Sequence, residues 1–261
     1  MSATNFTFSV VMPAFNSGTT ISRAVDSVLR QTWPPYELII INDASNDNTA
    51  QVVRPFISEN GPFKIRLVNL EHNRGPAYAR NIGWNLATGD YVAFLDSDDE
   101  WLPNKLLIQL QYLRRLPDIV LLGQTYPSLN RSRTPIFRVS KHLILARNQF
   151  WTSTVVIKRC VPERFDDSIR RCEDHLLFCM LTLSYKRSYY ISEPLVIEHK
   201  APLGESGLSK SIIRMQIANW RIYGILLRKH YINAFEYCMF EILSTLKFIV
   251  RPLKIVLWKL G

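Results

Sequence analysis

Short apolar runs alternate with amphipathic patterns through the first half of the chain. Runs rich in β-branched residues predict strands at 8–12, 37–41, 64–70 and 91–95. Apolar residues at helical spacing predict helices at 19–32, at 47–57, between Gly75 and Gly89, and at 103–115. Four strand–helix units in succession predict an α/β fold whose mostly parallel, right-handed sheet carries helices on both faces.

The pattern becomes less regular after about residue 118. Further strands are predicted at 119–123 and 153–158, and a helix at 173–183. From residue 211 the pattern is helical almost to the end. The chain therefore divides into a regular α/β part up to about residue 117, a less regular part over 118–210 and a helical C-terminal region over 211–261.

Polar residues follow each of the first four predicted strands. These segments are Pro13-Ala14-Phe15-Asn16, Asn42-Asp43-Ala44-Ser45, Glu71-His72-Asn73-Arg74-Gly75 and Asp96-Ser97-Asp98-Asp99. The carboxyl ends of parallel strands lie at the same edge of a sheet, and ligands of such sheets bind in the crevice outside that edge. We therefore expect these segments to line one binding site.

The run VAFLDSDDE at residues 92–100 ends a buried strand in a cluster of acidic residues. Neighbouring carboxylates repel one another, whereas a divalent cation such as Mg²⁺ or Mn²⁺ removes that repulsion and prefers oxygen ligands. Asp96 and Asp98 are therefore candidate ligands of a cation that also binds a diphosphate. Arg74 and Arg80 are candidates to neutralise the remaining phosphate charge.

The same polar residues also allow a purely structural interpretation. The acids of DSDDE could form the first turn of the next helix, because Pro103 marks a helix start nearby and acids are favourable there. Asp43 could cap the helix after the second strand, and Asn16 could be only a turn residue. The position of all these residues at one sheet edge favours a ligand site.

The amino-acid composition predicts that the protein binds an anionic partner. The 261 residues include 32 Lys and Arg against 22 Asp and Glu, a net charge of +10, which predicts attraction to nucleic acid, a membrane surface or a phosphorylated substrate. A nucleic-acid-binding protein would interleave basic and aromatic residues on one surface. Here the basic residues are spread widely and gather near the C-terminus, so nucleic acid is not the expected partner.

Compartment and membrane topology follow from the cysteines and from the apolar runs. The four cysteines show no CxxC pair, which favours a reducing compartment. The first twelve residues lack the pattern of a signal peptide, and no uncharged apolar run reaches 18 residues. We therefore expect a cytoplasmic protein without a spanning helix.

Four motifs in register resemble the family 2 glycosyltransferases. They are SVVMPAFN, IIINDASNDNT, NRGPAYARNIGWNLATGDYVAFLDSDD and the acidic pair at 173–174, and the resemblance covers roughly residues 8–200. It implies the GT-A fold, in which a Rossmann-like nucleotide-sugar half at about 1–117 adjoins an acceptor half at about 118–210. It also implies transfer of a sugar from a nucleotide sugar with the help of Mg²⁺ or Mn²⁺.

The resemblance assigns the donor side of the site. By position, Pro13, Ala14 and Asn16 would line the nucleotide base and ribose, and Asp43 would accept a hydrogen bond from a uracil-type ring N–H.

In the same way, Arg74, Gly75 and Arg80 would pack along the ribose and diphosphate, Gly75 by allowing close backbone approach. Asp96 would face ribose or metal, and Asp98 would be the principal metal ligand.

The resemblance also assigns the general base to the acidic pair. Asp174 would take the proton of an acceptor hydroxyl as it attacks the anomeric carbon, giving inversion by single displacement. Glu173 would orient the base or contact the acceptor, and both acids could instead be ordinary first-turn residues of a helix.

The sequence departs from the family pattern after Pro194. His199 would contact metal or diphosphate, with Lys200 or Lys210 supplying a cation, although a solvated loop is the alternative. No QxxRW motif of processive synthases occurs, which favours addition of one sugar at a time, and NQFW at 148–151 lies where an acceptor loop would be.

The C-terminal region combines apolar and basic residues. On a helix, Lys247, Arg251, Lys254 and Trp258 would share one face beside a broad apolar surface, which suits an anionic membrane surface. The alternative is a helix packed on its own domain.

The leading prediction from the sequence is an inverting, metal-dependent enzyme acting at the inner face of the cell membrane. It would move a sugar from a nucleotide sugar, expected to be a UDP-sugar, to a saccharide acceptor, expected to be linked to a polyprenyl diphosphate, in the synthesis of a surface polysaccharide. A catalytically inactive relative and a nucleic-acid-binding protein are the alternatives.

Overall fold

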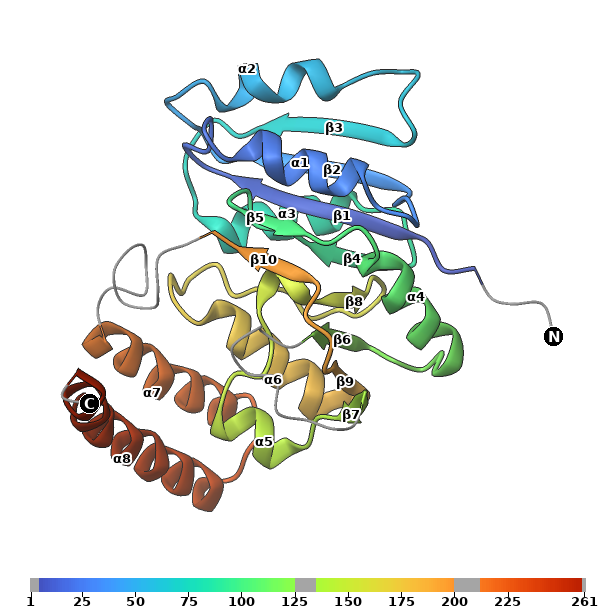
Figure 1. The fold of residues 1–261 in the computed structure, drawn as a ribbon. Helices are drawn as coiled ribbons and strands as arrows, with labels where there is room; N and C mark the ends of the chain where they lie inside the picture. The colour runs from blue at the N-terminus through green and yellow to red at the C-terminus, as the bar shows by residue number, and fades with distance from the viewer. Residues whose placement is uncertain (1–4, 125–134, 200–211, 260–261) are drawn as a thin grey trace.

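The computed structural model describes residues 5–124, 135–199 and 212–259. Figure 1 shows its elements along the chain. The strands are β1 (Phe8–Ala14), β2 (Glu37–Asn42), β3 (Lys64–Asn69), β4 (Tyr91–Phe94), β5 (Asp99–Trp101), β6 (Leu121–Gln124), β7 (Ile136–Arg138), β8 (Val156–Lys158), β9 (Ser188–Ile191) and β10 (Val196–Glu198). The α-helices are α1 (Ile21–Leu29), α2 (Thr49–Val53), α3 (Pro76–Leu86), α4 (Lys105–Arg115), α5 (Lys141–Ala146), α6 (Glu173–Tyr185), α7 (Ile212–Arg228) and α8 (Ala234–Lys259).

The central sheet has the strand order β3-β2-β1-β4-β8-β6-β9-β7 in the described part of the chain. The four strands predicted first, β1 to β4, are all parallel, which confirms the α/β part of the prediction. Beyond β4 the sheet is mixed, because β8 runs antiparallel to both β4 and β6, and β7 runs antiparallel to β9. A separate ribbon of β5 and β10 lies outside this sheet.

Both faces of the sheet are buried, which explains why its strands lack polar alternation. Val10 and Met12 of β1 pack in the core under α1 and α4, whereas Val11 between them packs in the core under α3 and α6. Neighbouring residues of a strand point to opposite faces, so each face receives its own apolar set. Helix α3 approaches β1 closely because Gly83 faces Val11, where a Cβ atom would lie 2.3 Å from a Val11 methyl group.

Two predicted elements differ in the structure. The helix expected over 47–57 ends as α2 at Val53 and continues as the 3₁₀ helix η1 (Arg54–Phe56), because Pro55 cannot supply a backbone N–H for an α-helical hydrogen bond. The strand expected over 153–158 is split into the 3₁₀ helix η3 (Thr152–Thr154) and β8.

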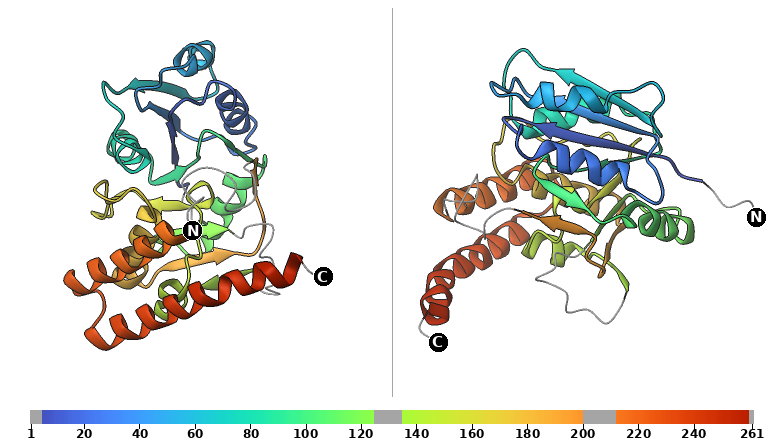
Figure 2. Two further views of the ribbon diagram at one scale, coloured as in Figure 1. Left: turned by 90° about the vertical axis from the view of Figure 1, so that its left-hand side faces the viewer. Right: turned by 45° about the horizontal axis from the view of Figure 1, so that its top comes forward.

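The C-terminal region forms an antiparallel pair of helices, α7 and α8, far from β3 (Figures 1 and 2). Helix α7 packs against α6, and helix α8 packs against α5. The inner face of the α7–α8 pair joins the core through buried residues such as Ile222, Leu226 and Phe240, and the Tyr223 hydroxyl donates to the Leu145 carbonyl at 2.8 Å. Within the described residues, no helix combines the length and the apolar character that crossing a membrane would require.

Candidate active site

The loops after the parallel strands meet at one edge, as the sequence predicted. Ala14, Asn42 and Asn69 lie side by side in register at the ends of β1, β2 and β3. The backbone N–H of Asn16 donates to Ser45 Oγ at 3.0 Å, and Asn16 Oδ1 accepts from the Asn46 N–H at 2.9 Å. These two bonds hold the loop after β1 against the loop after β2.

Several residues at this edge have a left-handed backbone. Asn16 has φ 51°, Ala44 has φ 56° and Cys172, just before the acidic pair, has φ 58°. This conformation is unfavourable for residues other than glycine, and above all for a residue such as alanine that cannot form local side-chain hydrogen bonds. Such strain concentrates at functional sites, where the surrounding structure imposes it.

Asp43 anchors the segment before α3. Its carboxylate is buried and accepts hydrogen bonds from the backbone N–H groups of Arg74 at 2.9 Å and Gly75 at 2.8 Å. The alternative that Asp43 caps α2 is therefore wrong, since Asn48 is the N-cap residue of that helix. Gly75 has φ 91° and is the N-cap residue of α3, and the space beside its Cα is open.

Pro13, Ala14 and Arg74 also lie at this edge. Pro13 and Ala14 are the last residues of β1 and are buried. The Arg74 guanidinium lies 3.8 Å above the centre of the Tyr78 ring, a cation–π contact that holds this exposed side chain along the first turn of α3.

The acidic run forms a carboxylate cluster on a turn between β4 and β5. One carboxylate oxygen from each of Asp96, Asp98 and Asp99 lies within 4.8 Å of the others. An all-oxygen set of this kind fits Mg²⁺ or Mn²⁺. The interpretation of these acids as a helix start is wrong, because Asp99 and Glu100 belong to β5 and the first turn of α4 contains no acidic residue.

Two serines hold the acidic turn in place. Ser153 Oγ accepts from the backbone N–H of Asp96 at 3.1 Å and donates to the Asp99 carboxylate. Ser17 Oγ lies 2.7 Å from Ser97 Oγ, which links the turn to the loop after β1. These contacts fix the backbone of the turn from both sides and hold the Asp99 carboxylate in position.

Arg80 joins the acidic turn to the acidic pair. It is 5% exposed, and its guanidinium donates to Asp96 Oδ1 at 2.7 Å and to Glu173 Oε1 at 3.1 Å. Burial alone would lower the pKa of Arg80, but the charges of Asp96 and Glu173 raise it above its usual value. The residue is therefore a permanent cation between two carboxylates that lie 77 positions apart.

The acidic pair opens α6. Asp174 Oδ1 accepts from the backbone N–H of His175 at 2.7 Å, and Oδ2 accepts from Asn148 Nδ2 at 3.1 Å. Burial raises the pKa of Asp174 despite these bonds, and burial together with the charge of Asp174 raises the pKa of Glu173. A carboxylate with a raised pKa is a stronger proton acceptor than a free aspartate.

His199 lies outside the carboxylate cluster in the described residues. Its Nε2 is 3.0 Å from Glu100 Oε2, and Arg30 binds the other oxygen of Glu100 at 3.1 Å. This group connects α1 with the β5–β10 ribbon. Lys200 and Lys210, the other candidates from this segment, lie outside the described residues.

Three side chains of this site were not singled out from the sequence: Asn148, Ser153 and Ser17. Asn148 belongs to NQFW, which was assigned to an acceptor loop, and its contact with Asp174 joins that loop to the acidic pair. Ser153 and Ser17 carry no sequence signal of their own, because a serine becomes part of a site only through its three-dimensional neighbours.

Comparison with known proteins decides the family. The model of the family described as "Glycosyl transferase family 2" matches residues 9–168, which is more than half of the chain. The chain belongs to glycosyl transferase family 2. This family 2 enzyme is therefore a glycosyltransferase, as its four motifs predicted.

Similar proteins include a bacterial enzyme and two solved structures. The Escherichia coli protein named UDP-Glc:alpha-D-GlcNAc-diphosphoundecaprenol beta-1,3-glucosyltransferase WfgD is 29% identical over 224 residues, covering 84% of this chain and 86% of WfgD. S. aureus TarS 1-349 in complex with UDP-GlcNAc aligns with a TM-score of 0.69 and 20% identity, over 85% of this chain and 66% of TarS.

The second solved structure is the mannosyltransferase PcManGT from Pyrobaculum calidifontis in complex with GDP-Man and Mn2+. It aligns with a TM-score of 0.69 and 20% identity, over 86% of this chain and 65% of PcManGT. The family 2 chain thus spans about two thirds of each solved chain. These likenesses confirm the GT-A fold that the sequence resemblance implied.

Proposed function

We propose that this family 2 enzyme transfers a sugar from a UDP-sugar to a saccharide acceptor, with inversion and with a divalent cation, in the synthesis of a bacterial surface polysaccharide. The bridge that Arg80 makes between Asp96 and Glu173 carries the proposal. It brings the candidate cation ligands and the candidate base into one site, as a transfer reaction requires. The name of WfgD, which includes UDP-Glc, and the complex of TarS with UDP-GlcNAc support the choice of donor.

The donor would lie along the edge formed by the β1, β2 and β3 loops. Pro13, Ala14 and Asn16 would line the base and ribose, with Asp43 near the uracil ring N–H. Each oxygen of Asp43 already accepts one backbone hydrogen bond, and each keeps a further lone pair for a ligand.

Arg74, Gly75 and Arg80 would lie along the ribose and diphosphate. The open space beside the Gly75 Cα leaves room for this approach. The φ of 91° at Gly75 is an equally direct reason for glycine at this position.

Asp96 and Asp98 would hold the cation, with Asp99 close behind them. When bound, Mg²⁺ or Mn²⁺ would neutralise negative charge on the diphosphate leaving group. His199 lies outside the set, with its Nε2 3.0 Å from the Glu100 carboxylate. The Mn2+ complex of PcManGT, which shares the fold, supports this choice of cation.

Asp174 would act as the general base. Its carboxylate takes the proton of the acceptor hydroxyl while that oxygen forms a bond to the anomeric carbon of the donor sugar. The bond from the anomeric carbon to the diphosphate oxygen breaks on the opposite face, and the nucleoside diphosphate leaves. Asn148, which donates to Asp174 Oδ2, would hold the base in position.

Donor binding can be measured by thermal unfolding with UDP-glucose, UDP-GlcNAc or GDP-mannose, with and without Mn²⁺. We expect a UDP-sugar to raise the melting temperature only when Mn²⁺ is present, because the diphosphate and the carboxylates then share the cation. A ligand at 100 times its Kd stabilises the fold by about 2.7 kcal/mol. UMP, which lacks the diphosphate, is the control. The absence of a shift with both UDP-sugars, whether or not GDP-mannose gives one, would reject the proposed donor class.

We further propose that the α7–α8 pair docks this enzyme on the inner face of the cell membrane, where a lipid-linked acceptor of the kind in WfgD's name would lie. Large apolar side chains at helical spacing are exposed on both helices: Ile213, Ile217 and Trp220 on α7, and Phe235, Met239, Ile242 and Leu246 on α8. Phe235 is 77% exposed and Ile213 is 64% exposed. An apolar surface of this extent favours contact with a partner or a bilayer.

The charges around this apolar surface suit an anionic bilayer. Arg214, Arg221 and Arg228 recur every seven residues along α7 and are exposed, as is Lys229. Among the described side chains of the two helices, no exposed one is acidic. Lys247, which was predicted to belong to a basic stripe, instead donates to the Ala146 carbonyl at 2.8 Å, and the side chains of Arg251, Lys254 and Trp258 lie outside the described residues.

A double variant, Phe235→Asp with Ile242→Asp, tests the docking surface. Burying one such side chain contributes about 1.5–3 kcal/mol, so we expect at least a tenfold loss of binding to vesicles that contain phosphatidylglycerol. Sedimentation with vesicles measures the bound fraction. Ile57→Asp, which changes an apolar residue that is 44% exposed in another part of the fold, is the matched control. Equal vesicle binding by the double variant and the wild type would reject this surface.

A further inference from the structure

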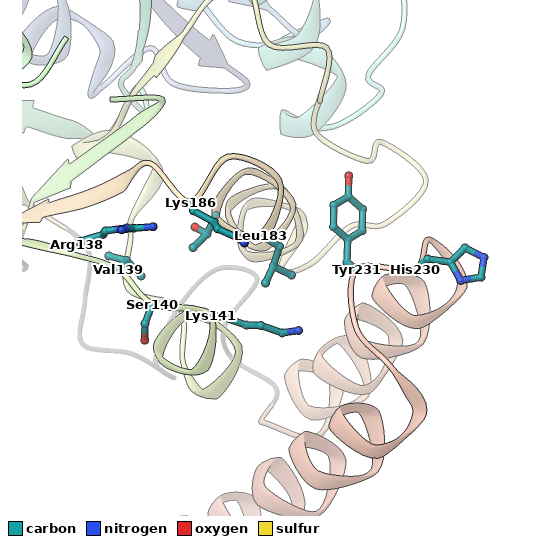
Figure 3. A pocket seen from close by; sticks show the side chains of 9 residues that line it. Arg138, Val139, Ser140, Lys141, Leu183, Lys186, His230 and Tyr231 are labelled. Carbon is teal, nitrogen blue, oxygen red and sulfur yellow. The ribbon is translucent and has the colours of Figure 1, made fainter. Parts of the chain in front are cut away.

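A cavity of about 570 Å³ lies beside the C-terminal end of α6 (Figure 3). Its walls come from three separate parts of the chain: the segment from the end of β7 to the start of α5, the C-terminal end of α6, and the turn between α7 and α8. Asp174 lies at the other end of α6, and a helix of 13 residues is about 20 Å long. The cavity is therefore separate from the proposed site of sugar transfer.

Among the residues that line the cavity, the Arg, Lys and His side chains are all basic, and Tyr231 is the remaining titratable group. The basic side chains are Arg138, Lys141, Lys186 and His230, and the lining residues include no carboxylate. Lys141 is neutralised by Glu236 at 2.6 Å, whereas Arg138 and Lys186 form no ion pair among the described residues. Figure 3 shows Arg138, Lys141 and Lys186 entering from three different elements. Like charges brought together by the fold create a positive potential that attracts an anion.

The backbone at two of these residues would favour glycine. Lys186 has φ 53° and His230 has φ 60°, and they lie just past the ends of α6 and α7. A left-handed residue after a helix is usually glycine, because glycine has no Cβ atom to strain the conformation. Local backbone geometry therefore does not account for the long cationic side chain of Lys186, whereas a ligand in the cavity would.

We propose that this cavity binds a phosphoryl group, either of a soluble phosphate ester or of a lipid headgroup. The guanidinium of Arg138 offers a planar fork of N–H donors that matches phosphate oxygens, and Lys186 adds a point charge. The hydroxyl groups of Ser140 and Tyr231, which also line the cavity, supply neutral donors. The turn between the two proposed membrane helices forms one wall, so a lipid headgroup is one of the two sources.

Pyrophosphate binding measured by calorimetry in the presence of EDTA tests the cavity, because EDTA removes the cation on which the proposed donor site depends. We expect the wild type to bind pyrophosphate under these conditions. Lys186→Gly and Arg138→Gln should each weaken binding about tenfold, the effect of losing one charge-assisted hydrogen bond. Lys186→Gly is an informative variant because glycine suits φ 53° and the protein should fold at least as stably. Lys64→Gln, which removes an exposed charge at the start of β3, at the opposite end of the sheet from β7, is the matched control.

The same variants distinguish the two sources of phosphate. Weaker binding of Lys186→Gly to phosphatidylglycerol vesicles as well as to pyrophosphate would support a headgroup, and weaker binding to pyrophosphate alone would support a soluble ester. The proposal is overturned if the wild type does not bind pyrophosphate in EDTA, or if both variants bind it as tightly as the wild type. Transfer to a soluble acceptor should be unchanged in Lys186→Gly, so a failure here is separate from a failure of the proposed activity.

Discussion

Replacement of Asp174 by asparagine is expected to lower the rate of sugar transfer by about two to four orders of magnitude, the usual contribution of a general base. The acceptor hydroxyl keeps its proton in the variant, because an amide cannot take it. Donor binding should be retained, since the proposed donor contacts lie on other loops. Initial rates of UDP release with acceptor present, compared with the thermal shift caused by the donor, separate the two effects.

The pH dependence of the wild type gives a second measurement of the same residue. Burial raises the pKa of Asp174, and the base works only when deprotonated, so the rate should fall as the pH drops through this raised pKa. The apparent pKa of the acid limb of the pH–rate profile should therefore lie above the usual pKa range of an aspartate. Asp174 and Glu173 both have raised pKa values and interact, so the limb belongs to the pair.

Asp167→Asn is the matched control for Asp174→Asn, because Asp167 is an exposed acid seven positions earlier in the chain. It should leave both the rate and the acid limb unchanged. A full transfer rate in Asp174→Asn with the donor bound would show that another residue is the base.

Replacement of Asp98 by alanine is expected to abolish the dependence of transfer on Mn²⁺ or Mg²⁺ and to lower turnover by about 100-fold or more. Changes to groups that merely support a metal ligand already cost about 10- to 100-fold. Asp98 is expected to bind the cation directly, through a carboxylate that lies within 4.8 Å of those of Asp96 and Asp99. Titration of apo enzyme with Mn²⁺, followed by transfer rate and by melting temperature, measures both effects.

Asp118→Ala controls for the loss of an acid at the surface, since Asp118 is exposed and lies 3.8 Å from Arg187. It should respond to Mn²⁺ like the wild type. If Asp98→Ala keeps its turnover and its metal response, the cation does not bind at the acidic turn.

Much of the fold was predictable because the signals are local. The continuous apolar run ELIII at 37–41 reflects a strand that is buried on both faces, and the helical spacing of 19–32 reflects a helix that is buried on one face. Both patterns can be recognised from neighbouring residues alone, without knowledge of distant parts of the chain. The parallel order of β1 to β4 followed from the alternation of strands and helices. The ribbon of β5 and β10 was not predicted, because its strands have three residues each and their pairing joins positions almost 100 residues apart.

The candidate site was predictable in its members but not in their contacts. Polar residues at the carboxyl ends of strands indicated the edge, and four motifs in order indicated the family. The bonds of Asp43 to the backbone of Arg74 and Gly75, and of His199 to Glu100, could not be read from the sequence. A hydrogen bond to a backbone N–H depends on the distance and direction between the two groups. The identity of a residue indicates neither of these.

The sequence by itself determined that this protein would build a parallel sheet, deliver acids and amides to one edge of it, and carry basic helices at its C-terminus. Only the tertiary structure decided that Arg80 would lie between Asp96 and Glu173, that Asn148 would hold Asp174, and which face of the α7–α8 pair would remain exposed. The physical reason is that periodicity and turn chemistry act over a few residues. Contacts between residues as far apart as 80 and 173 exist only when the whole core packs around them.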